Sequence, residues 1–436
     1  MFLILEINKK GVFLLNYIDL KYKPQKTDLV CEFYLEPNNT TIENAASNVA
    51  LESSIGTWTD IGTMNKRIAK TLKPSVFYIN KKENIIKIAY NENLFEKGNM
   101  PEILSSIAGN IFGMSVVKNL RLLDISFPES IVKSFKGPRF GINGIRKITG
   151  IKNRPLIGII VKPKLGLNEK EHAKVAYDAW TGGLDIVKDD ENLTSMKFNN
   201  FNKRVIETLK MRNKAEKETG ETKIYMPNIT AETNEMLKRA RFVKANGGRY
   251  VMIDIITSGW SALQTLRNAD LGLVIHAHRA GHAAFTRDEK HGITMLVIAK
   301  IARLVGVDQL HIGAIVGKMT GTKHEIKDIR EDIENQIITE KGTYMLEQKW
   351  YNIKPTLAVC SGGLHPGGIP PLMKIMGNNI VMQFGGGCHG HPDGTKAGAM
   401  AIKQAVDSAI KKIPLKTYAK DHKELKKAID KFGIIS

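Results

Sequence analysis

Eight short apolar runs, separated by helix-length stretches of mixed polar and apolar residues, occupy the chain after Pro155. Runs of this length are typical of buried parallel strands, and the stretches between them are long enough to form crossover helices. The runs span 156–161, 184–188, 223–229, 250–256, 273–278, 309–315, 356–360 and 380–384. The alternation predicts an α/β fold with a closed (β/α)8 TIM barrel, in which the active site lies at the C-terminal ends of the strands.

Six of the eight runs end in charged, polar or glycine residues, which a buried strand would not carry without a reason. Because the C-terminal ends of barrel strands meet at one rim, we expect these residues to form a single site. In chain order they are Lys162 and Lys164; Lys188, Asp190 and Glu191; His276, His278 and Arg279; His311; Ser361, Gly362 and Gly363; and Gln383, Gly385 and Gly386.

The second run ends in one lysine and three acids, from Lys188 to Glu191. Carboxylates this dense repel one another unless a hard cation lies between them, and oxygen ligation of this kind suits Mg²⁺. Lys188 cannot ligate a metal as an ammonium, so it is either a counter-ion to the acids or chemically altered. This segment alone is equally consistent with a solvated acidic helix cap.

Glycine-rich turns follow the last two runs, and a barrel places exposed backbone N–H groups against a phosphate at this position. Arg279 and His311 offer a second cationic pocket across the rim. The predicted substrate therefore carries phosphate at both ends. His276 and His278 face one side of a strand and could suggest zinc, but Arg279 beside them would repel a cation. We therefore expect His278 to act as a catalytic acid or base.

The region before the barrel mixes strand-like and helix-like segments and predicts a small α+β domain. The segments are strands at 29–35, 76–79 and 85–90 and helices at 42–52 and 101–109. A Gly/Pro/Lys-rich passage at 135–152 predicts a connection. With 436 residues, the chain fits a barrel of about 250 residues plus a smaller domain. The predicted organisation is an N-terminal extension at 1–16, the α+β domain at 17–135, and the barrel with a C-terminal helical tail at 136–436.

The formal net charge of +20 could indicate a nucleic-acid partner, but the lysines are interleaved with acids along amphipathic segments, as expected of solvated helix faces. Nucleic-acid binding therefore stays a remote alternative. Three widely spaced cysteines without a Cys-x-x-Cys pair indicate neither a disulfide framework nor a thiolate zinc site, and favour a cytoplasmic location. No apolar run approaches the roughly 20 residues that a bilayer requires, so we expect no membrane span.

The chain resembles the large subunit of ribulose-1,5-bisphosphate carboxylase/oxygenase (RuBisCO) from about residue 17 to about residue 412. The composition, the compact length and the segment 28–34 are most similar to the archaeal form III branch, which is associated with disposal of ribose from nucleotides and works without small subunits. The motifs that carry the resemblance are Lys162-Pro163-Lys164-Leu165-Gly166-Leu167, Gly183 to Asn192, His276-Ala277-His278-Arg279-Ala280, Val316-Gly317-Lys318, Ser361-Gly362-Gly363 and Gln383-Phe384-Gly385-Gly386-Gly387.

The resemblance implies carboxylation and cleavage of ribulose 1,5-bisphosphate by CO₂ and water to two 3-phosphoglycerate molecules, with a side reaction with O₂. Lys188 would be carbamylated by CO₂ and would bind Mg²⁺ together with Asp190 and Glu191. Lys162 would be the final acid, with His278 assisting proton transfer and Lys318 closing over the site on a loop. The implied substrate-binding residues are Lys164, Arg279, His311, Ser361, Gly362, Gly363, Gln383, Gly385 and Gly386.

By the same resemblance, the N-terminal domain is ferredoxin-like and contributes four residues to the site of a neighbouring subunit. They are Glu52, Thr57, Trp58 and Asn110. The active unit would then be a homodimer or an assembly of homodimers. Two departures from plant-type chains, Ile160 and Thr320, concern gas selectivity and the energetics of loop closure. A RuBisCO-like enolase or isomerase that acts on a related phosphorylated sugar is the main alternative.

Overall fold

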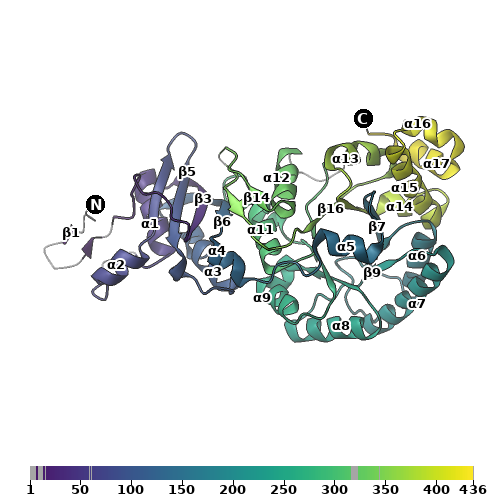
Figure 1. Cartoon of the computed structure of the whole chain (residues 1–436), viewed down its shortest axis with the longest axis horizontal. Helices are drawn as coiled ribbons and strands as arrows, with labels where there is room; N and C mark the ends of the chain where they lie inside the picture. The colour runs from purple at the N-terminus through teal and green to yellow at the C-terminus, as the bar shows by residue number, and fades with distance from the viewer. Residues whose placement is uncertain are drawn as a thin grey trace. The chain divides into compact units, whose positions relative to one another are not determined.

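The computed structural model describes residues 6–7, 13–14, 16–57, 59, 61–315, 323–342 and 344–435. The chain forms two compact units (Figure 1), and each is described by itself. Unit 1 comprises Met1–Lys136, Gly281–Leu304 and Asn335–Ile353, and unit 2 comprises Gly137–Ala280, Val305–Glu334 and Lys354–Ser436. The predicted boundaries at 17–135 and 136–436 stay a prediction about which parts fold independently.

Unit 2 contains one eight-stranded parallel sheet, in the order β10-β11-β13-β16-β17-β7-β8-β9. A parallel bridge between Asn228 and Met252 joins β9 to β10. The ring of strands therefore closes, and the predicted barrel is confirmed. The strands are β7 (Leu156–Ile160), β8 (Ile186–Lys188), β9 (Ile224–Met226), β10 (Tyr250–Asp254), β11 (Val274–His278), β13 (Gln309–His311), β16 (Leu357–Ser361) and β17 (Ile380–Phe384).

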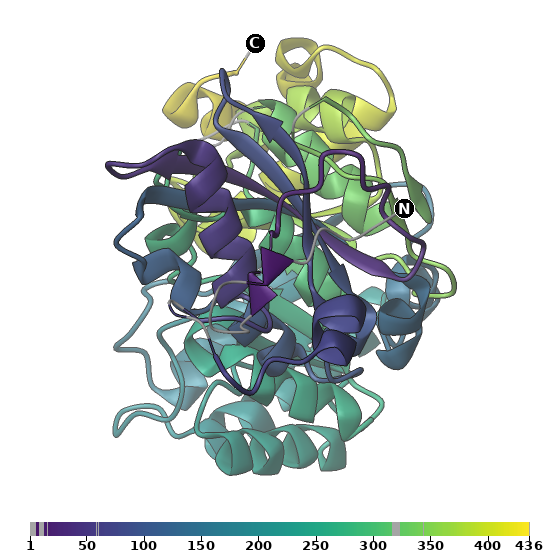
Figure 2. The ribbon, with the colours of Figure 1, turned by 90° about the vertical axis from the view of Figure 1, so that its left-hand side faces the viewer.

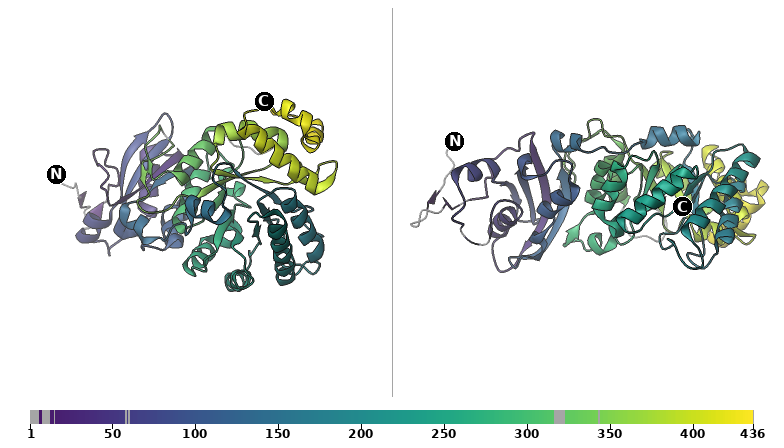
Figure 3. Two further views of the ribbon diagram at one scale, coloured as in Figure 1. Left: turned by 45° about the vertical axis from the view of Figure 1, so that its right-hand side comes forward. Right: turned by 90° about the horizontal axis from the view of Figure 1, so that it is seen from below.

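Helices follow the strands of unit 2, as a parallel barrel requires. Figure 3 shows the C-terminal helices in yellow. Among them, α15 packs on α13 and α17, and it also packs on α6. The helices are α5 (Gly141–Thr149), α6 (Glu169–Thr181), α7 (Phe201–Thr219), α8 (Thr233–Ala245), α9 (Ile255–Asn268), α12 (Lys323–Glu334), α13 (Ile369–Met376), α14 (Gly386–His389), α15 (Gly394–Ile410), α16 (Leu415–Tyr418) and α17 (Lys423–Phe432), with short 3-10 turns η3 (Pro366–Gly368) and η4 (Ala419–Asp421).

The junction between the two units, after Lys136, lies in the passage 135–152 that was predicted to be a connection, but helix α5 occupies half of that passage and was not predicted. Three glycines between 141 and 150 suggested a loop. Ile142 and Ile145, however, lie three residues apart on one helical face and join the barrel's hydrophobic core. The strand residues of that core are Leu156, Ile186, Ile224, Met226, Tyr250, Met252, Val274, Leu357, Val359 and Val381.

Helices α6 and α7 are set by clear local signals. Asn168 and Glu171 form a capping box at the start of α6. Asn200 caps α7, which ends at Gly220 with a left-handed φ of 68°. Each helix also buries a polar residue, His172 on α6 and Arg204 on α7. Both of these side chains approach the end of β8, as described below.

Unit 1 is built on a mixed sheet in the order β12-β6-β3-β5-β4 (Figure 2). Within it, β6, β3, β5 and β4 are antiparallel neighbours in this order. Counted along the chain, these are the fourth, first, third and second strands of the four, which is the ferredoxin-like arrangement predicted from the resemblance. Its strands are β3 (Asp28–Pro37), β4 (Ser75–Asn80), β5 (Ile85–Asn91), β6 (Val117–Ser126) and β12 (Gly292–Ile293), with two small sheets of β1 (Glu6–Ile7) and β2 (Phe13–Leu14), and of β14 (Ile337–Ile338) and β15 (Gln348–Lys349).

The helices of unit 1 include both predicted ones. Thr41 caps the first of them and Asn99 the second, each through a side-chain oxygen that accepts a backbone N–H. They are α1 (Ile42–Glu52), α2 (Lys66–Leu72), α3 (Met100–Ile107), α4 (Glu129–Ser134), α10 (Ala283–Thr286) and α11 (Met295–Val305), with 3-10 turns η1 (Glu92–Leu94) and η2 (Asn110–Gly113). Within the described residues, no helix is long and apolar enough to cross a membrane.

Glu32 makes the stability of unit 1 depend on pH. Its carboxyl group is fully buried in β3, where burial raises its pKa to about 7 although Lys87 lies 3.2 Å away. Because the folded pKa exceeds the unfolded value of 4.5, the stabilising contribution is full below pH 4.5 and is lost as the pH rises through 7. Relative to the wild type, Glu32→Gln should therefore gain about 3 kcal/mol between pH 4.5 and pH 8.

Urea unfolding at the two pH values measures this difference. Wild-type and variant stabilities that change in parallel with pH would show that Glu32 ionises in the folded protein as it does in the unfolded chain.

Candidate active site

Lys188 is the last residue of β8 and its side chain is fully buried. Its Nζ donates to the carbonyl oxygen of Asp189 at 2.7 Å and lies 3.7 Å from Glu191 Oε2. Burial lowers the pKa of this amine, against the opposing effects of Glu191, Asp254 and Asp190. A lysine held in this way reaches its neutral, nucleophilic form more readily than a solvated one.

Asp190 and Glu191, the second and third acids after this lysine, lie beside several cations. Lys162 Nζ contacts Asp190 Oδ2 at 2.5 Å, and Lys164 Nζ lies 3.8 Å from Glu191 Oε1. Burial would raise the pKa of Glu191, but Lys188 and His278 outweigh it and hold the pKa at about 2. Both carboxylates therefore lie beside positively charged groups.

The donor set fits Mg²⁺ only if Lys188 is modified. Among the described residues, no three His, Cys, Asp or Glu side chains lie together in a way that could hold a metal. Asp190 and Glu191 provide two oxygen ligands, and a hard cation favours more. Carbamylation would give Lys188 an anionic oxygen beside these two, and would complete a three-residue oxygen site.

His278 ends β11, where its Nδ1 lies 2.6 Å from Asp254 Oδ1 and its Nε2 lies 3.8 Å from Glu191 Oε2. The backbone N–H of Ala280 also approaches Nδ1, at 3.2 Å. The shorter contact to a carboxylate indicates that Nδ1 carries the proton, which leaves Nε2 as the base that faces the acids.

Sequence reasoning missed Asp254 as a site residue. It ends β10 and is the register partner of His278 on β11. The predicted fourth run extended to Ile256, whereas the strand ends at this acid, so the rule that picked out six polar strand ends passed over it. Asn228 after β9 was missed in the same way, although its side chain reaches the carbonyl oxygen of Glu191 at 3.0 Å.

A second group of predicted residues gathers at the ends of β13 and β16. His311 Nδ1 lies 2.8 Å from Ser361 Oγ, and its Nε2 lies 2.9 Å from His276 Nε2. Burial lowers the pKa of both imidazoles, to about 3 for His276 and well below the usual value for His311. Two neutral rings can share one N–H between facing nitrogens, and two charged rings cannot.

Arg279 lies on the same side of the rim. Burial lowers the pKa of its guanidinium to about 10, but it keeps its charge at neutral pH. A side chain at Gly313 would begin 2.9 Å from an Arg279 nitrogen, so glycine at this position leaves room for the guanidinium. Gly313 also has φ 97°, a conformation that other residues rarely adopt.

The predicted glycine turns follow β16 and β17. Gly362 and Gly363 both have positive φ, at 108° and 74°, and Gly385 precedes the short helix α14. A side chain at Gly385 would begin 3.4 Å from Lys162 Cε, which places this turn beside the lysine. Gln383 lies inside the barrel, where its Oε1 is buried without a hydrogen-bond partner.

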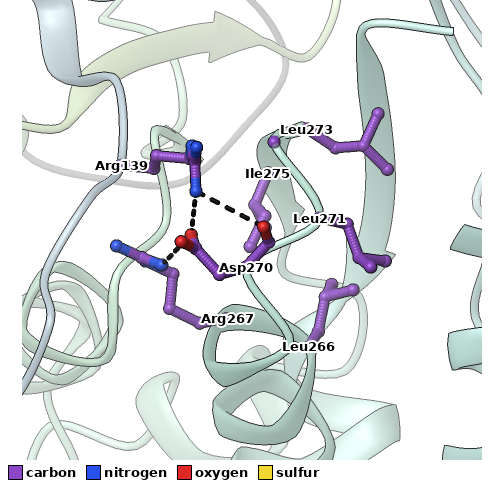
Figure 4. A pocket seen from close by; sticks show the side chains of 8 residues that line it. Arg139, Leu266, Arg267, Asp270, Leu271, Leu273 and Ile275 are labelled. Atoms are coloured by element: carbon purple, nitrogen blue, oxygen red, sulfur yellow. Dashed lines mark hydrogen bonds and ion pairs between the residues drawn. The ribbon is translucent and has the colours of Figure 1, made fainter. Parts of the chain in front are cut away.

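Two hollows of unit 2 lie at the opposite, N-terminal end of the barrel. In one, drawn in Figure 4, Arg139 and Arg267 both contact Asp270. Its volume of about 10 Å³ is enough for one water molecule at most. The other, of about 420 Å³, is an open depression beside Arg146 and Asn379. The charged strand ends lie at neither hollow, so we place the site at the C-terminal rim.

Five predicted residues lie outside this picture. Lys318 and Trp58 fall outside the described residues. Glu52 ends α1 and is half-buried, Thr57 follows it and is also half-buried, and Asn110 begins η2 and is exposed. These three belong to unit 1, and their roles stay predictions.

Comparisons with known proteins cover both units. The family model described as ribulose bisphosphate carboxylase large chain, catalytic domain, matches residues 141–432, and the corresponding N-terminal domain model matches residues 16–131. A protein named ribulose bisphosphate carboxylase from Methanosarcina mazei is 51% identical over 96% of this chain and 99% of its own length. One from Methanocaldococcus jannaschii is 50% identical over 95% and 99%.

Solved structures agree. The octameric Rubisco of Pyrococcus horikoshii superposes with a TM-score of 0.89 at 48% identity, over 96% of both chains. The dimeric archaeal Rubisco of Hyperthermus butylicus gives 0.91 at 43% identity, over 96% of this chain and 99% of that one. The chain therefore belongs to the ribulose bisphosphate carboxylase large-chain family of enzymes.

Proposed function

We propose that the chain carboxylates ribulose 1,5-bisphosphate with CO₂ and water to two 3-phosphoglycerate molecules, with O₂ as a competing reactant. The observation that carries the proposal is the buried amine of Lys188 beside Asp190 and Glu191. Burying an amine and carboxylates at the end of a strand costs free energy of folding, so such a group of residues indicates a functional role. The role that we propose is activation, in which Lys188 reacts with CO₂ and the three residues bind Mg²⁺.

Activation begins at the Lys188 amine. After losing a proton, its nitrogen attacks CO₂, forms a nitrogen–carbon bond and releases a second proton to solvent, which leaves an anionic carbamate. The lowered pKa of Lys188 makes the first proton loss easier. When bound, Mg²⁺ would stabilise the negative charge that develops on the substrate oxygens.

The remaining residues move protons. Modified Lys188 would take the proton from carbon 3 of the sugar, and His278, fixed by Asp254, would assist hydration and cleavage. Lys162 would protonate the final carbanion. Its contact with Asp190 keeps its amine at the rim.

Arg279, His311 and Ser361 would bind one phosphate. The second phosphate would lie against the turns at Gly362, Gly363, Gly385 and Gly386, with Gln383 contacting the sugar. The contact between His311 and Ser361 and the positive φ of the first two glycines support this division. Backbone N–H groups in such turns bind anions without a bulky side chain in the way.

The assembly we propose is a homodimer, or several homodimers, without a small subunit. Glu52, Thr57, Trp58 and Asn110 would complete the partner's site, and Lys318 would close over the substrate. The relatives from Pyrococcus and Hyperthermus, described as octameric and dimeric, support assembly from one kind of chain. We further propose that the enzyme serves the salvage of ribose from nucleotides, as the resemblance to the archaeal branch suggests.

The decisive experiment follows labelled bicarbonate into acid-stable product, with purified protein, ribulose 1,5-bisphosphate and Mg²⁺ under anaerobic conditions. We expect label in 3-phosphoglycerate. A folded, CO₂- and Mg²⁺-treated protein that fixes no label, but enolises or isomerises a phosphorylated sugar, would favour the enolase-like alternative. Salt-sensitive retention of RNA or DNA without either activity would favour nucleic-acid binding.

A further inference from the structure

Asp189 lies between Lys188 and Asp190, yet its side chain has a separate set of partners. The carboxylate is fully buried. Oδ1 accepts from the Tyr225 hydroxyl at 2.8 Å and lies 3.1 Å from His172 Nε2. Oδ2 accepts from Arg204 Nε at 3.1 Å and from the backbone N–H of Asn228 at 2.9 Å. A buried carboxylate persists only where it is paired and hydrogen-bonded, and this one is held from α6, α7 and the β9 end.

Arg204 connects both sides of the loop that carries the acids. Besides Asp189, its guanidinium donates to Thr194 O at 2.7 Å and to Asn199 Oδ1 at 2.8 Å. Asp189 precedes Asp190 and Glu191 in the chain, whereas Thr194 and Asn199 follow them. One buried cation therefore fixes the loop before and after the two predicted ligands.

Asn228 fixes the middle of the same loop. Its backbone N–H donates to Asp189, while its side-chain Nδ2 donates to the carbonyl oxygen of Glu191 at 3.0 Å and approaches that of Asp190 at 3.4 Å. Its Oδ1 accepts the N–H of Thr230, which orients the amide. Asn228 thus links the Asp189 carboxylate to the backbone of both acids.

We infer that Asp189 is a positioning residue that, through Arg204 and Asn228, holds Asp190 and Glu191 where they can share one Mg²⁺ with carbamylated Lys188. It touches neither the metal nor the substrate. Its loss weakens assembly of the metal site and leaves substrate binding by the assembled site unchanged. The inference rests on the proposed function, because it concerns the same carbamate and metal.

The test compares Asp189→Asn with the matched control Asp185→Asn. Asp185 is also a buried acid of the same β8 segment, paired with Arg154 through two contacts of 2.7 Å, but it lies before the strand, at the opposite end of the barrel. Carbamate on Lys188 is measured by ¹³C NMR with labelled CO₂ as Mg²⁺ is titrated, without any substrate. KM for ribulose 1,5-bisphosphate is then measured at saturating Mg²⁺.

For Asp189→Asn we expect the Mg²⁺ concentration at half-maximal carbamate to rise about tenfold or more, as is typical when a group that orients metal ligands is removed. KM should stay within about threefold, because a group of this kind acts on the metal ligands and does not contact the substrate. Asp185→Asn should leave both quantities within about twofold of the wild type, even if it lowers the melting temperature.

Tyr225→Phe provides a milder variant in case Asp189→Asn does not fold, since it removes one donor and keeps the ring. It should raise the Mg²⁺ requirement about two- to fivefold, less than Asp189→Asn, because the carboxylate keeps its contacts with Arg204, His172 and Asn228. Wild-type Mg²⁺ dependence in every folded variant, or an equal shift in Asp185→Asn, would overturn the inference alone. Absence of Mg²⁺-dependent carbamate in the wild type would overturn the proposed function, and the inference with it.

Discussion

Replacement of Lys188 by methionine is expected to reduce carboxylation of ribulose 1,5-bisphosphate by about 10³-fold or more, because in the proposed mechanism this amine both completes the metal site and takes the substrate proton. The folded protein should lose only about 1–3 kcal/mol, for the lost hydrogen bond to the carbonyl oxygen of Asp189 and the lost contact with Glu191. The amine is fully buried, and methionine of similar length fills its space without a polar atom to desolvate. Carbon fixation and thermal unfolding measure the two effects.

Lys223→Met is the matched control. Lys223 is also fully buried, but it lies just before β9, where its Nζ donates to Leu184 O at 3.0 Å and contacts Glu221 at 2.6 Å. We expect this variant to lose stability, since it removes a paired cation, and to keep its activity per folded molecule. A Lys188→Met enzyme that keeps more than about a tenth of wild-type activity would contradict a base and ligand role for this amine.

The barrel could be predicted because its eight apolar runs are local features of the sequence. Their ends were less predictable: the run at 223–229 contains the shorter strand β9 (Ile224–Met226), and the run at 309–315 contains β13 (Gln309–His311). In both, apolar residues continue beyond the strand, such as Pro227 and Ile229 after β9 and Ile312 and Ala314 after β13, so the local pattern runs past the strand end. Helix α5 was missed because glycine at 141, 144 and 150 outweighed its isoleucine spacing in the local pattern, whereas packing on the barrel decides the outcome.

The candidate site was predictable where the residues that act together follow one another in the sequence, as Lys188, Asp190 and Glu191 do. Contacts between distant segments were not. Arg204 lies 15 residues from Asp189, and the two side chains meet only because α7 packs beside the end of β8. Nothing in the local sequence distinguishes it from the solvated lysines of the same helix, since its burial depends on tertiary structure.

Asp254→Asn is expected to lower kcat by about 10²–10⁴-fold with little change in KM, because Asp254 determines which nitrogen of His278 carries the proton. In the wild type, the carboxylate accepts from Nδ1 at 2.6 Å and leaves Nε2 free of hydrogen toward Glu191. In the variant, the amide can donate to Nδ1, which the backbone N–H of Ala280 also faces at 3.2 Å. The ring would then carry its hydrogen on Nε2 and lose the basic nitrogen that we propose acts on the substrate. Nitrogen NMR of the imidazole reports this tautomer directly.

A double variant separates this role from a general loss of structure. If Asp254 acts only through His278, then Asp254→Asn combined with His278→Gln should lose no more kcat than His278→Gln alone, since residues that act as a unit are not additive. Multiplicative losses would instead assign Asp254 an independent effect, for example on the neighbouring Lys188. A single Asp254→Asn variant with kcat within about threefold of the wild type would show that the tautomer of His278 is fixed by other groups, or that His278 is not the base.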